Sequence, residues 1–290
     1  MVERAPDAAS HEPPHACAQG VGRREKRHLV LNKPLFIVAL LLMCATRAFA
    51  WGHEGHRIIA GIAQDRLTPA ARAEVQRLMG TDQLANFATW ADDIRPQRRG
   101  TAPWHYVNIP SSAKNYDSQR DCLEGDCVVE KLKQFSATLR DARQPLLARQ
   151  EALKWVIHLT GDIHQPFHAI ADARGGNDVP IQEVGSSDCG RYPCELHALW
   201  DTDMLRHMGL RERRYVLQLE ELIDQQHLQA SGDPEQWANE SFRDAKAAWV
   251  DPGTNIDGTY FERKLPVLNE RLAIAGLRLA ALLNADLKGP

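Results

Sequence analysis

The sequence predicts an all-α fold, and three observations support this prediction. Apolar residues recur at helical spacing along most of the chain, Pro and Gly cluster between those segments, and alternating strand patterns are nearly absent. With 43% hydrophobic and 25% charged residues among 290, the composition is that of a globular chain, not of a disordered or repeat protein. A formal net charge of -3 disfavours a nucleic-acid binder that relies on a basic surface.

The first fifty residues have the pattern of a secretory leader. Residues 1–28 are polar and lack periodicity, and Lys33 then precedes an apolar run over 34–45. That run is shorter than the roughly 20 residues needed to span a bilayer as a helix. Small residues at its end predict cleavage after Ala50. We therefore expect one secreted or periplasmic domain over 51–290, monomeric and without stable membrane association.

Helices are predicted in order along this domain. The first covers 56–67, where apolar side chains share one helical face. Thr68 and Pro69 then provide an N-cap and a first-turn proline for a helix over 70–79, which Gly80 ends. The same reasoning predicts helices at 84–94, 128–142, 147–164, 196–208, 211–229, 234–249 and 259–287.

Two long loops, 96–127 and 171–195, are predicted between these helices, and loops of that length in a compact domain are usually functional. They hold the four cysteines of the mature chain, in two pairs of equal spacing: Cys122 with Cys127, and Cys189 with Cys194. In an exported chain, two local disulfides are expected in preference to metal ligands, although four cysteines allow three connectivities. The remaining possibility of lipidation at Cys44 is disfavoured by Met43, which precedes it.

The densest group of ligand-type residues lies around the end of the helix at 147–164. His158 and Asp162 are four residues apart and share a face, so together they can bind one ion. His164 falls nearly opposite His158 on the helix and is interpreted as structural. Pro166 ends the helix and allows His168 to turn back toward the site.

The same i and i+4 spacing recurs at His197 and Asp201, and further candidates stand at His56, Asp92 and His105. Imidazole and carboxylate are the ligands that zinc takes where thiolate is absent. A mature chain that begins at Trp51 adds a terminal amine, which with the carbonyl of the same residue could form a five-membered chelate. The sequence therefore predicts a zinc site assembled from separated segments.

The motifs also occur in a recognisable order. They read Trp-Gly-x-x-Gly-His, Trp-Ala-Asp, Trp-His-Tyr, His-x-x-x-Asp-x-His-Gln-Pro-x-His, Gly-Gly-Asn and a closing His-x-x-Trp-Asp. Over nearly the whole mature chain, this order resembles the zinc-dependent single-strand nucleases of the S-one and P-one type. The resemblance implies a single helical domain of the phospholipase C and P-one nuclease type, with three zinc ions in a cleft.

The resemblance also implies a ligand set for each ion. The first ion would be bound by Asp92, His105, His158 and Asp162. The second would be bound by His168, His197 and Asp201, and the third by the Trp51 backbone, His56 and the shared Asp162.

By the same resemblance, the protein would be an endonuclease that hydrolyses single-stranded DNA and RNA to 5′-phosphate products, with 3′-nucleotidase activity as an addition. A metal-bridged hydroxide would attack phosphorus in line, with Asp92, Asp162 and Arg95 as catalytic residues. Tyr106, Asn108 and Asn177 would bind the nucleotide, Tyr106 by stacking. The simpler interpretations are an exposed arginine for Arg95 and a flexible Gly-Gly loop before Asn177.

Two alternatives remain open at this point. The metal scaffold also occurs in bacterial zinc phospholipase C, so a lipid phosphodiesterase is possible, although that family typically has Glu where Asp201 stands and lacks the cysteine pairs. A non-catalytic zinc-binding secreted protein is the other alternative. In the predicted mature chain, four histidines fall outside the ligand set and are interpreted as surface or packing residues: His53, His164, His207 and His227.

Overall fold

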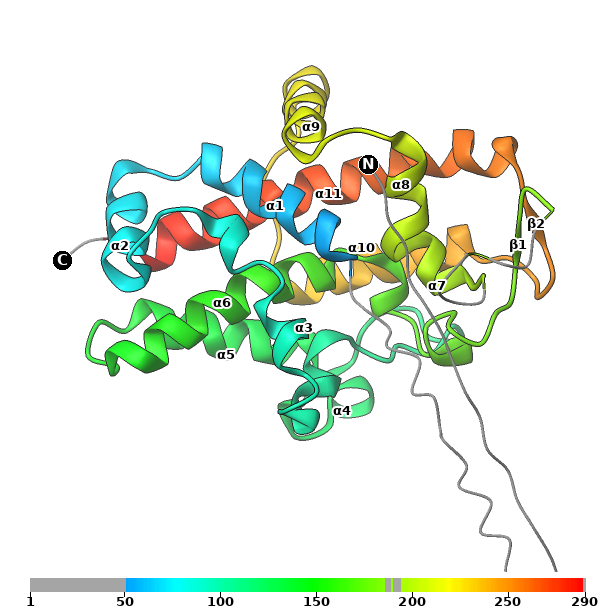
Figure 1. The fold of residues 1–290 in the computed structure, drawn as a ribbon. Helices are drawn as coiled ribbons and strands as arrows, with labels where there is room; N and C mark the ends of the chain where they lie inside the picture. The colour runs from blue at the N-terminus through cyan, green and yellow to red at the C-terminus, as the bar shows by residue number, and fades with distance from the viewer. Residues whose placement is uncertain (1–50, 186–188, 190–193, 289–290) are drawn as a thin grey trace, which may run out of the picture. The chain divides into compact units, whose positions relative to one another are not determined.

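The computed structural model describes residues 51–185, 189 and 194–288, and the predicted leader over 1–50 lies outside the described residues. The fold is almost entirely helical, as predicted (Figure 1). Its α-helices are α1 (His53–Asp65), α2 (Pro69–Met79), α3 (Trp90–Ile94), α4 (Ser118–Asp121), α5 (Val128–Arg140), α6 (Leu146–Ile163), α7 (Leu196–Ala198), α8 (Met204–Met208), α9 (Glu212–Gln226), α10 (Pro234–Ala248) and α11 (Gly258–Asp286). The shorter elements are η1 (Leu84–Asn86), η2 (Arg99–His105), η3 (Leu123–Gly125), η4 (Pro166–His168), η5 (Asp172–Arg174), the π-helical η6 (Leu199–Asp203), β1 (Gln182–Glu183) and β2 (Asn255–Ile256).

The helix boundaries follow the local capping signals. The side chain of Thr68 accepts a hydrogen bond from the Ala71 amide at 3.2 Å, and Gly80 takes the left-handed conformation at the other end of α2. Asp233 caps α10 in the same way, accepting from the amides of the second and third residues after it. These ends lie within a few residues of the predicted ones because caps are local features of the sequence.

Helix α6 lies at the centre of the packing. It contacts α1, α2, α3, α5, α10 and α11, and every residue from Trp155 to Ile163 is buried. A second close contact joins α1 to α11, where Gly276 faces Ile62. A Cβ atom at Gly276 would lie 2.5 Å from Ile62, so only glycine permits this approach of the two helices. Helix α6 is thus held from all sides before its last turn reaches the site.

The end of α6 is fixed from behind by α10 and α11. His164 hydrogen-bonds the carbonyl of Thr160 through Nδ1, at 2.7 Å, and its Nε2 lies 2.9 Å from Arg278 Nη1. Arg278 also donates to both carboxylate oxygens of Glu240, at 2.6 and 2.9 Å. The hydroxyl of Ser241 donates to the carbonyl of Ile163 at 2.6 Å. We refer to these contacts of His164, Arg278, Glu240 and Ser241 as the rear network.

Some predicted elements differ from the structure. The single helix predicted at 84–94 is wrong, because η1 and α3 are separate short helices here. The helix predicted at 196–208 is interrupted by the π-helical turn η6, and the loops at 96–127 and 171–195 contain short helical turns and strand β1. Strand β1 pairs in parallel with β2, a contact between segments far apart in the sequence. Both predicted disulfides are confirmed, Cys122 with Cys127 and Cys189 with Cys194.

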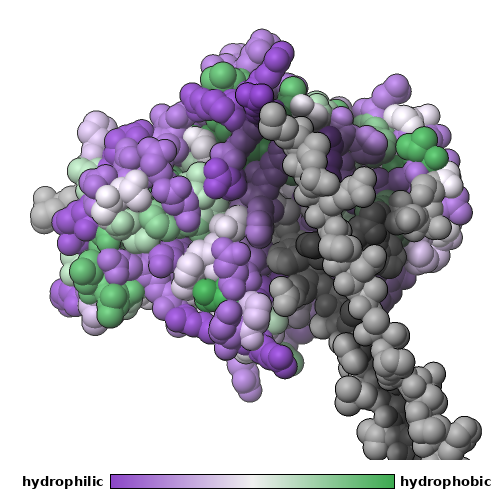
Figure 2. Space-filling model, in the orientation of Figure 1, coloured by the Kyte–Doolittle hydropathy of each residue, from purple (hydrophilic) through white to green (hydrophobic). Residues whose placement is uncertain are grey.

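Within the described part of the chain, none of the helices is both long and apolar enough to cross a membrane. The face drawn in Figure 2, apart from what the grey atoms cover, is mostly hydrophilic with small separated hydrophobic areas. The large apolar side chains most exposed among the described residues are Leu123 in η3, the neighbours Leu146 and Leu147 at the start of α6, Val184 after β1, and Leu217 on α9.

Candidate metal centre

Eight titratable side chains, all of them predicted as metal ligands, converge in the interior of the domain. They come from α1, α3, α6, the end of η2, η4, α7 and η6, and each has at most 5% of its surface exposed. They are His56, Asp92, His105, His158, Asp162, His168, His197 and Asp201. Burial of so many ionisable groups is costly unless they are paired or bind an ion.

Asp162 occupies the middle of the first group. Its Oδ2 lies 2.9 Å from His105 Nδ1 and 3.2 Å from His158 Nε2, and its Oδ1 lies 3.4 Å from His56 Nε2. Asp92 closes the group from α3, with Oδ1 at 3.7 Å from His158 Nε2 and 3.8 Å from His105 Nδ1. The predicted i and i+4 pair on α6 therefore faces side chains from three other segments.

The second group joins His168 to the pair on the last helical turns before α8. His197 Nε2 lies 3.2 Å from Asp201 Oδ2, and His168 Nε2 lies 3.9 Å from Asp201 Oδ1. His168 Nδ1 is 3.7 Å from Asp162 Oδ1, so the two groups adjoin. The π-helical turn η6 carries Asp201, and π-helical turns inside helices are frequent at functional sites.

The charges in the first group influence one another strongly. Burial lowers the pKa of His56 and of His105. Burial also acts to lower the pKa of His158, but the carboxylates of Asp162 and Asp92 raise it to about 9. Burial acts to raise the pKa of Asp162, yet His158 and the imidazoles beside it hold that pKa well below its usual range. In the second group, burial lowers the pKa of His168 to about 4.

The unsatisfied polar atoms of these side chains test whether a metal fits. Buried polar atoms are nearly always hydrogen-bonded. Here several buried ligand-type atoms have no hydrogen-bond partner among the described residues: both ring nitrogens of His56, Asp92 Oδ2, His105 Nε2, Asp162 Oδ1 and His197 Nε2. The eight side chains also form three sets that could each hold an ion, namely His56 with His158 and Asp162, Asp92 with His105 and His158, and His168 with His197 and Asp201. This nitrogen and oxygen donor set suits zinc.

Backbone carbonyls orient three of the imidazoles. Nδ1 of His158 donates to the carbonyl of Ala88 at 2.8 Å, and Nδ1 of His168 donates to that of His105 at 2.7 Å. Nδ1 of His197 donates to the carbonyl of Gly175 at 2.6 Å. A carbonyl only accepts, so each Nδ1 carries a proton and Nε2 is the ring nitrogen that could bind an ion, as is usual for metal-binding histidines.

Trp51 lies beside the second group. Its side chain is fully buried, and the amide of Gly52 donates to the carbonyl of Asp201 at 2.6 Å. This contact holds the start of the described chain against the segment that carries Asp201. Coordination by the Trp51 amine and carbonyl stays a prediction.

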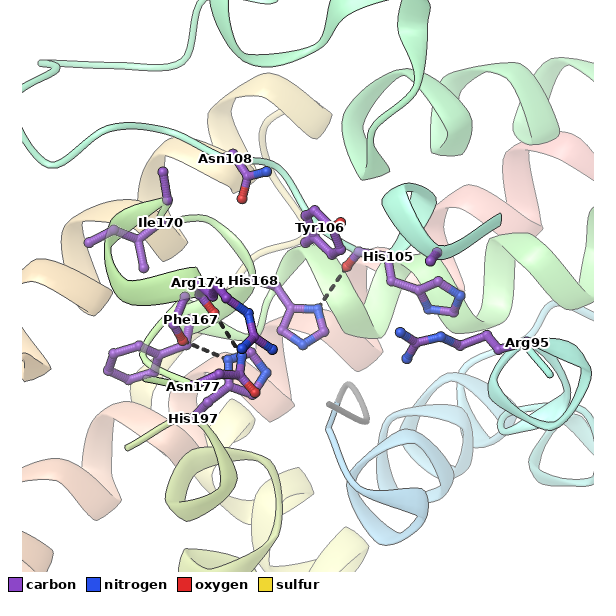
Figure 3. Close-up of a pocket in the computed structure, with 13 residues that line it drawn as sticks. Arg95, His105, Tyr106, Asn108, Phe167, His168, Ile170, Arg174, Asn177 and His197 are labelled. Atoms are coloured by element: carbon purple, nitrogen blue, oxygen red, sulfur yellow. Dashed lines mark hydrogen bonds between the residues drawn. The ribbon is translucent and has the colours of Figure 1, made fainter. Parts of the chain in front are cut away.

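A pocket of about 420 Å³ opens beside this cluster of predicted metal ligands (Figure 3). His105, His168 and His197 form part of its wall. The four residues predicted to contact substrate line the same pocket, namely Arg95, Tyr106, Asn108 and Asn177. The guanidinium of Arg95 lies 3.4 Å from Asp92 Oδ1 and points toward the pocket, so the simpler interpretation of an exposed helix end is incomplete.

The structure adds two residues that the sequence did not single out. Gln165 is fully buried, donates through its side-chain amide to Asp201 Oδ1, and accepts from the amide of Phe167. It therefore occupies one oxygen of Asp201 and leaves the other toward His197. Its place inside the His-Gln-Pro-x-His motif is the signal that could have indicated this. Arg174 lines the pocket, and nothing in the local sequence indicates that it does.

The four remaining histidines lie outside the cluster, as predicted. His164 belongs to the rear network, and His53 is an exposed residue 4.0 Å from Asp93. His207 is exposed and has its ring centre 4.5 Å from that of Phe261, and His227 ends α9 on the surface. Trp155 packs edge-on against His105, with ring centres 5.8 Å apart, and so gives this part of the cluster an apolar neighbour.

Comparison with known proteins agrees with this geometry. A family model described as S1/P1 Nuclease matches residues 51–288. Endonuclease 2 of Arabidopsis thaliana is 28% identical over 89% of this chain and 96% of its own length. Nuclease S1 of Aspergillus oryzae is 28% identical over 86% of this chain and 96% of its own length. Endonuclease 5 of Arabidopsis thaliana is 31% identical over 86% of this chain and 95% of its own length.

Proposed function

Because the chain belongs to the S1/P1 nuclease family and is therefore a hydrolase of phosphodiester bonds in nucleic acids, we propose that it is a zinc-dependent endonuclease specific for single-stranded DNA and RNA. The proposal includes 5′-phosphate products and secretion after cleavage near Ala50. The observation that carries it is the convergence of eight buried metal-ligand side chains beside a pocket that an aromatic ring and a guanidinium also line.

We propose three ions with the ligands named from the sequence. Asp92, His105, His158 and Asp162 would hold one, and His168, His197 and Asp201 would hold another. The Trp51 backbone, His56 and Asp162 would hold the third. The three side-chain sets found in the structure support three positions, and the unsatisfied atoms of His56, His105 and His197 support ligation. Zinc in these positions would polarise water and the phosphodiester for in-line attack at phosphorus.

The protein's own side chains define how the substrate would lie. Arg95 is held at Asp92 and faces the pocket, so its guanidinium would contact the phosphate and stabilise the negative charge that develops on its oxygens. Three dications against the carboxylates of Asp92, Asp162 and Asp201 would leave the centre positive, which explains how a chain of negative net charge can bind a polyanion.

Single-strand preference follows from the place of Tyr106. Its ring lines the pocket directly after the ligand-type residue His105, where a base could stack only after leaving a duplex. Asn108 and Asn177, which line the same pocket, would contact the base edge. The same site would dephosphorylate 3′-nucleotides, because the ester bond of a 3′-nucleotide joins phosphate to a 3′ oxygen, as the phosphodiester does.

The lipid phosphodiesterase alternative finds less support. The large exposed apolar side chains named above come from four different segments, and of them Leu146 and Leu147 are neighbours, whereas a lipid-binding face would gather more of them together. A purely structural zinc site is also disfavoured, because ligand-type histidines line an open pocket while structural zinc sites are closed.

One experiment tests the proposal directly. The purified protein is analysed for zinc and incubated with a short single-stranded oligonucleotide, the same sequence as a duplex, and phosphatidylcholine. We expect about three zinc ions per chain and 5′-phosphorylated fragments from the single strand, formed well before any from the duplex. Release of phosphocholine without oligonucleotide cleavage would replace this function by the lipid alternative, and bound zinc without any hydrolysis would indicate the non-catalytic one.

A further inference from the structure

The charged groups on the pocket wall have one sign. Two guanidinium groups line the pocket, those of Arg95 and Arg174, and no carboxylate is among the described residues that line it. Figure 3 shows the two arginines reaching the pocket from opposite sides, with His168 between them in this view. Arg95 is accounted for by the scissile phosphate, which leaves Arg174 as a second anion-binding group without an assigned role.

The loop that carries Arg174 is built in an unusual conformation. Ala173 and Arg174 have φ angles of 43° and 53°, in the left-handed region that residues other than glycine rarely adopt. Such conformations are strained and persist where the surrounding structure imposes them, most often at functional sites. The backbone conformation therefore points to a reason for placing this side chain where it is.

The same loop is tied to the metal centre. The carbonyl of Gly175, directly after Arg174, accepts from Nδ1 of His197, and the side-chain amide of Asn177 donates to the carbonyl of Arg174 at 2.7 Å. On the other side of the loop, Asp172 accepts from the amide and hydroxyl of Ser111 at 2.8 and 2.6 Å. The backbone at Arg174 thus has a fixed position relative to the catalytic ligands.

Among the described residues, one carboxylate is bonded to Arg174, and it leaves most of the guanidinium available. Arg174 Nη1 donates to Asp178 Oδ1 at 2.9 Å, and both side chains are more than half exposed. Exposed ion pairs of this kind contribute little to stability. A guanidinium has five N–H donors in a planar fork that matches a phosphate group, so the remaining donors can bind one.

We propose that Arg174 binds a second phosphate of the substrate, the one that flanks the scissile phosphodiester on the same strand. The inference rests on the proposed nuclease function and adds a subsite to it. The two arginines would then hold successive phosphates on opposite sides of the pocket, with the base of the nucleotide between them against Tyr106. The subsite favours a strand over a dinucleotide, because only a strand supplies the second phosphate.

The test compares two substrates with different numbers of phosphates. Thymidylyl-thymidine has one phosphodiester and no flanking phosphate, whereas octathymidylate supplies flanking phosphates. The Arg174→Gln variant should raise KM for octathymidylate about 3- to 10-fold more than KM for thymidylyl-thymidine, with the loss in KM and not in kcat. The slope of log KM for the octamer against log salt should also fall by about 0.7, as expected for one lost phosphate contact on a single strand.

The Asp178→Asn variant separates binding from a structural role. If Arg174 serves substrate, removing its competing carboxylate should leave KM for the octamer equal or lower. If the ion pair with Asp178 only stabilises the loop, both variants should lose activity alike, and the inference is overturned. It is equally overturned if Arg174→Gln changes both substrates by the same factor. Failure of the unmodified protein to cleave either substrate would instead refute the proposed function.

Discussion

Two sides of the end of helix α6 use the same kind of residue for different purposes. On one side, His158 and Asp162 face the cluster of predicted metal ligands, where several neighbouring polar atoms have no hydrogen-bond partner in the described part of the chain. On the other side, His164 bonds through both ring nitrogens, to the carbonyl of Thr160 and to Arg278. His158 and His164 are six residues apart and both are fully buried.

The difference shows how a functional histidine is distinguished from a structural one. Burial is the same for both, so burial alone does not distinguish them. What differs is the surroundings of each ring. His158 Nε2 lies 3.0 Å from another imidazole nitrogen, His105 Nδ1, in a cluster where several polar atoms lack a hydrogen-bond partner among the described residues, whereas His164 lies between a carbonyl and a guanidinium. Variants of the two sides should therefore separate metal binding and turnover from stability, and four predictions test this.

The largest effect is expected from Asp162→Asn on the metal-facing side. The change keeps the shape of the side chain but removes the charge that contacts His56, His105 and His158. We expect hydrolysis of single-stranded DNA and RNA to fall by about 10³-fold or more, with reduced zinc content. Initial rates and elemental analysis measure both. Near-normal turnover would exclude Asp162 as a shared ligand.

A second prediction concerns the start of the mature chain. One extra residue before Trp51 would remove the free amine at that position and displace a fully buried side chain. We expect the loss of one zinc ion and a decrease in activity on the order of 10- to 100-fold. A protein with one residue added after Pro290 is the matched control. If the N-terminally extended protein retains full zinc content and turnover, the amine is not a ligand.

A third variant tests Gln165, which orients the second group from the end of α6. Gln165→Ala frees Asp201 Oδ1, so the carboxylate can rotate away from His197. Such changes next to metal ligands typically cost about 10- to 100-fold in metal affinity or activity. Gln150→Ala is the matched control, because Gln150 lies near the start of α6 and its side-chain amide donates to the carbonyl of Leu78. Equal behaviour of the two variants would show that Gln165 only fills space.

The smallest effect on turnover is expected from Glu240→Gln in the rear network. Burial acts to raise the pKa of Glu240, but hydrogen bonds from Arg278 and Arg271 lower it below its ordinary value of 4.5. A carboxyl whose pKa is lower in the folded state stabilises the fold above pH 4.5, and this contribution is lost as pH falls through the lowered pKa. We expect the free energy of unfolding at pH 7 to decrease by about 1–2 kcal/mol, discounted for partial exposure.

Urea unfolding at pH 7 and at successively lower pH measures this prediction. The difference between the unmodified protein and Glu240→Gln should shrink as the pH falls below 4.5, while zinc content at pH 7 stays the same. Loss of zinc in this variant would mean that the rear network and the metal centre are not separable, and the comparison between the two sides would fail.

Much of the site could be predicted because its signals are local. The i and i+4 spacing of His158 with Asp162, and of His197 with Asp201, places each pair on one face regardless of the rest of the fold. Capping residues such as Thr68 likewise mark helix ends without tertiary information. The motif order supplied what spacing could not, namely which separated segments belong to one centre.

The remaining features depend on contacts between distant segments. The region 84–94 has helical periodicity, yet it breaks into η1 and α3, and Asp92 on α3 packs against α6. No residue type within η6 identifies it from the sequence as a π-helical turn. The place of Arg174 arises from a loop that returns to His197, and no local pattern encodes that return.

Because α1 packs closely on α11, a substitution at a position remote from the metal cluster can alter the geometry of that cluster. Gly276 allows Ile62 to approach, and Ile62 lies about two turns after His56 on the same rigid helix. A methyl group at 276 would displace α1 as a unit and carry an imidazole away from Asp162, although nothing near the ions has changed. Directed evolution of this enzyme for altered rates or metal preference could therefore begin at the helix contact, where small steps in side-chain volume become small steps in ligand geometry.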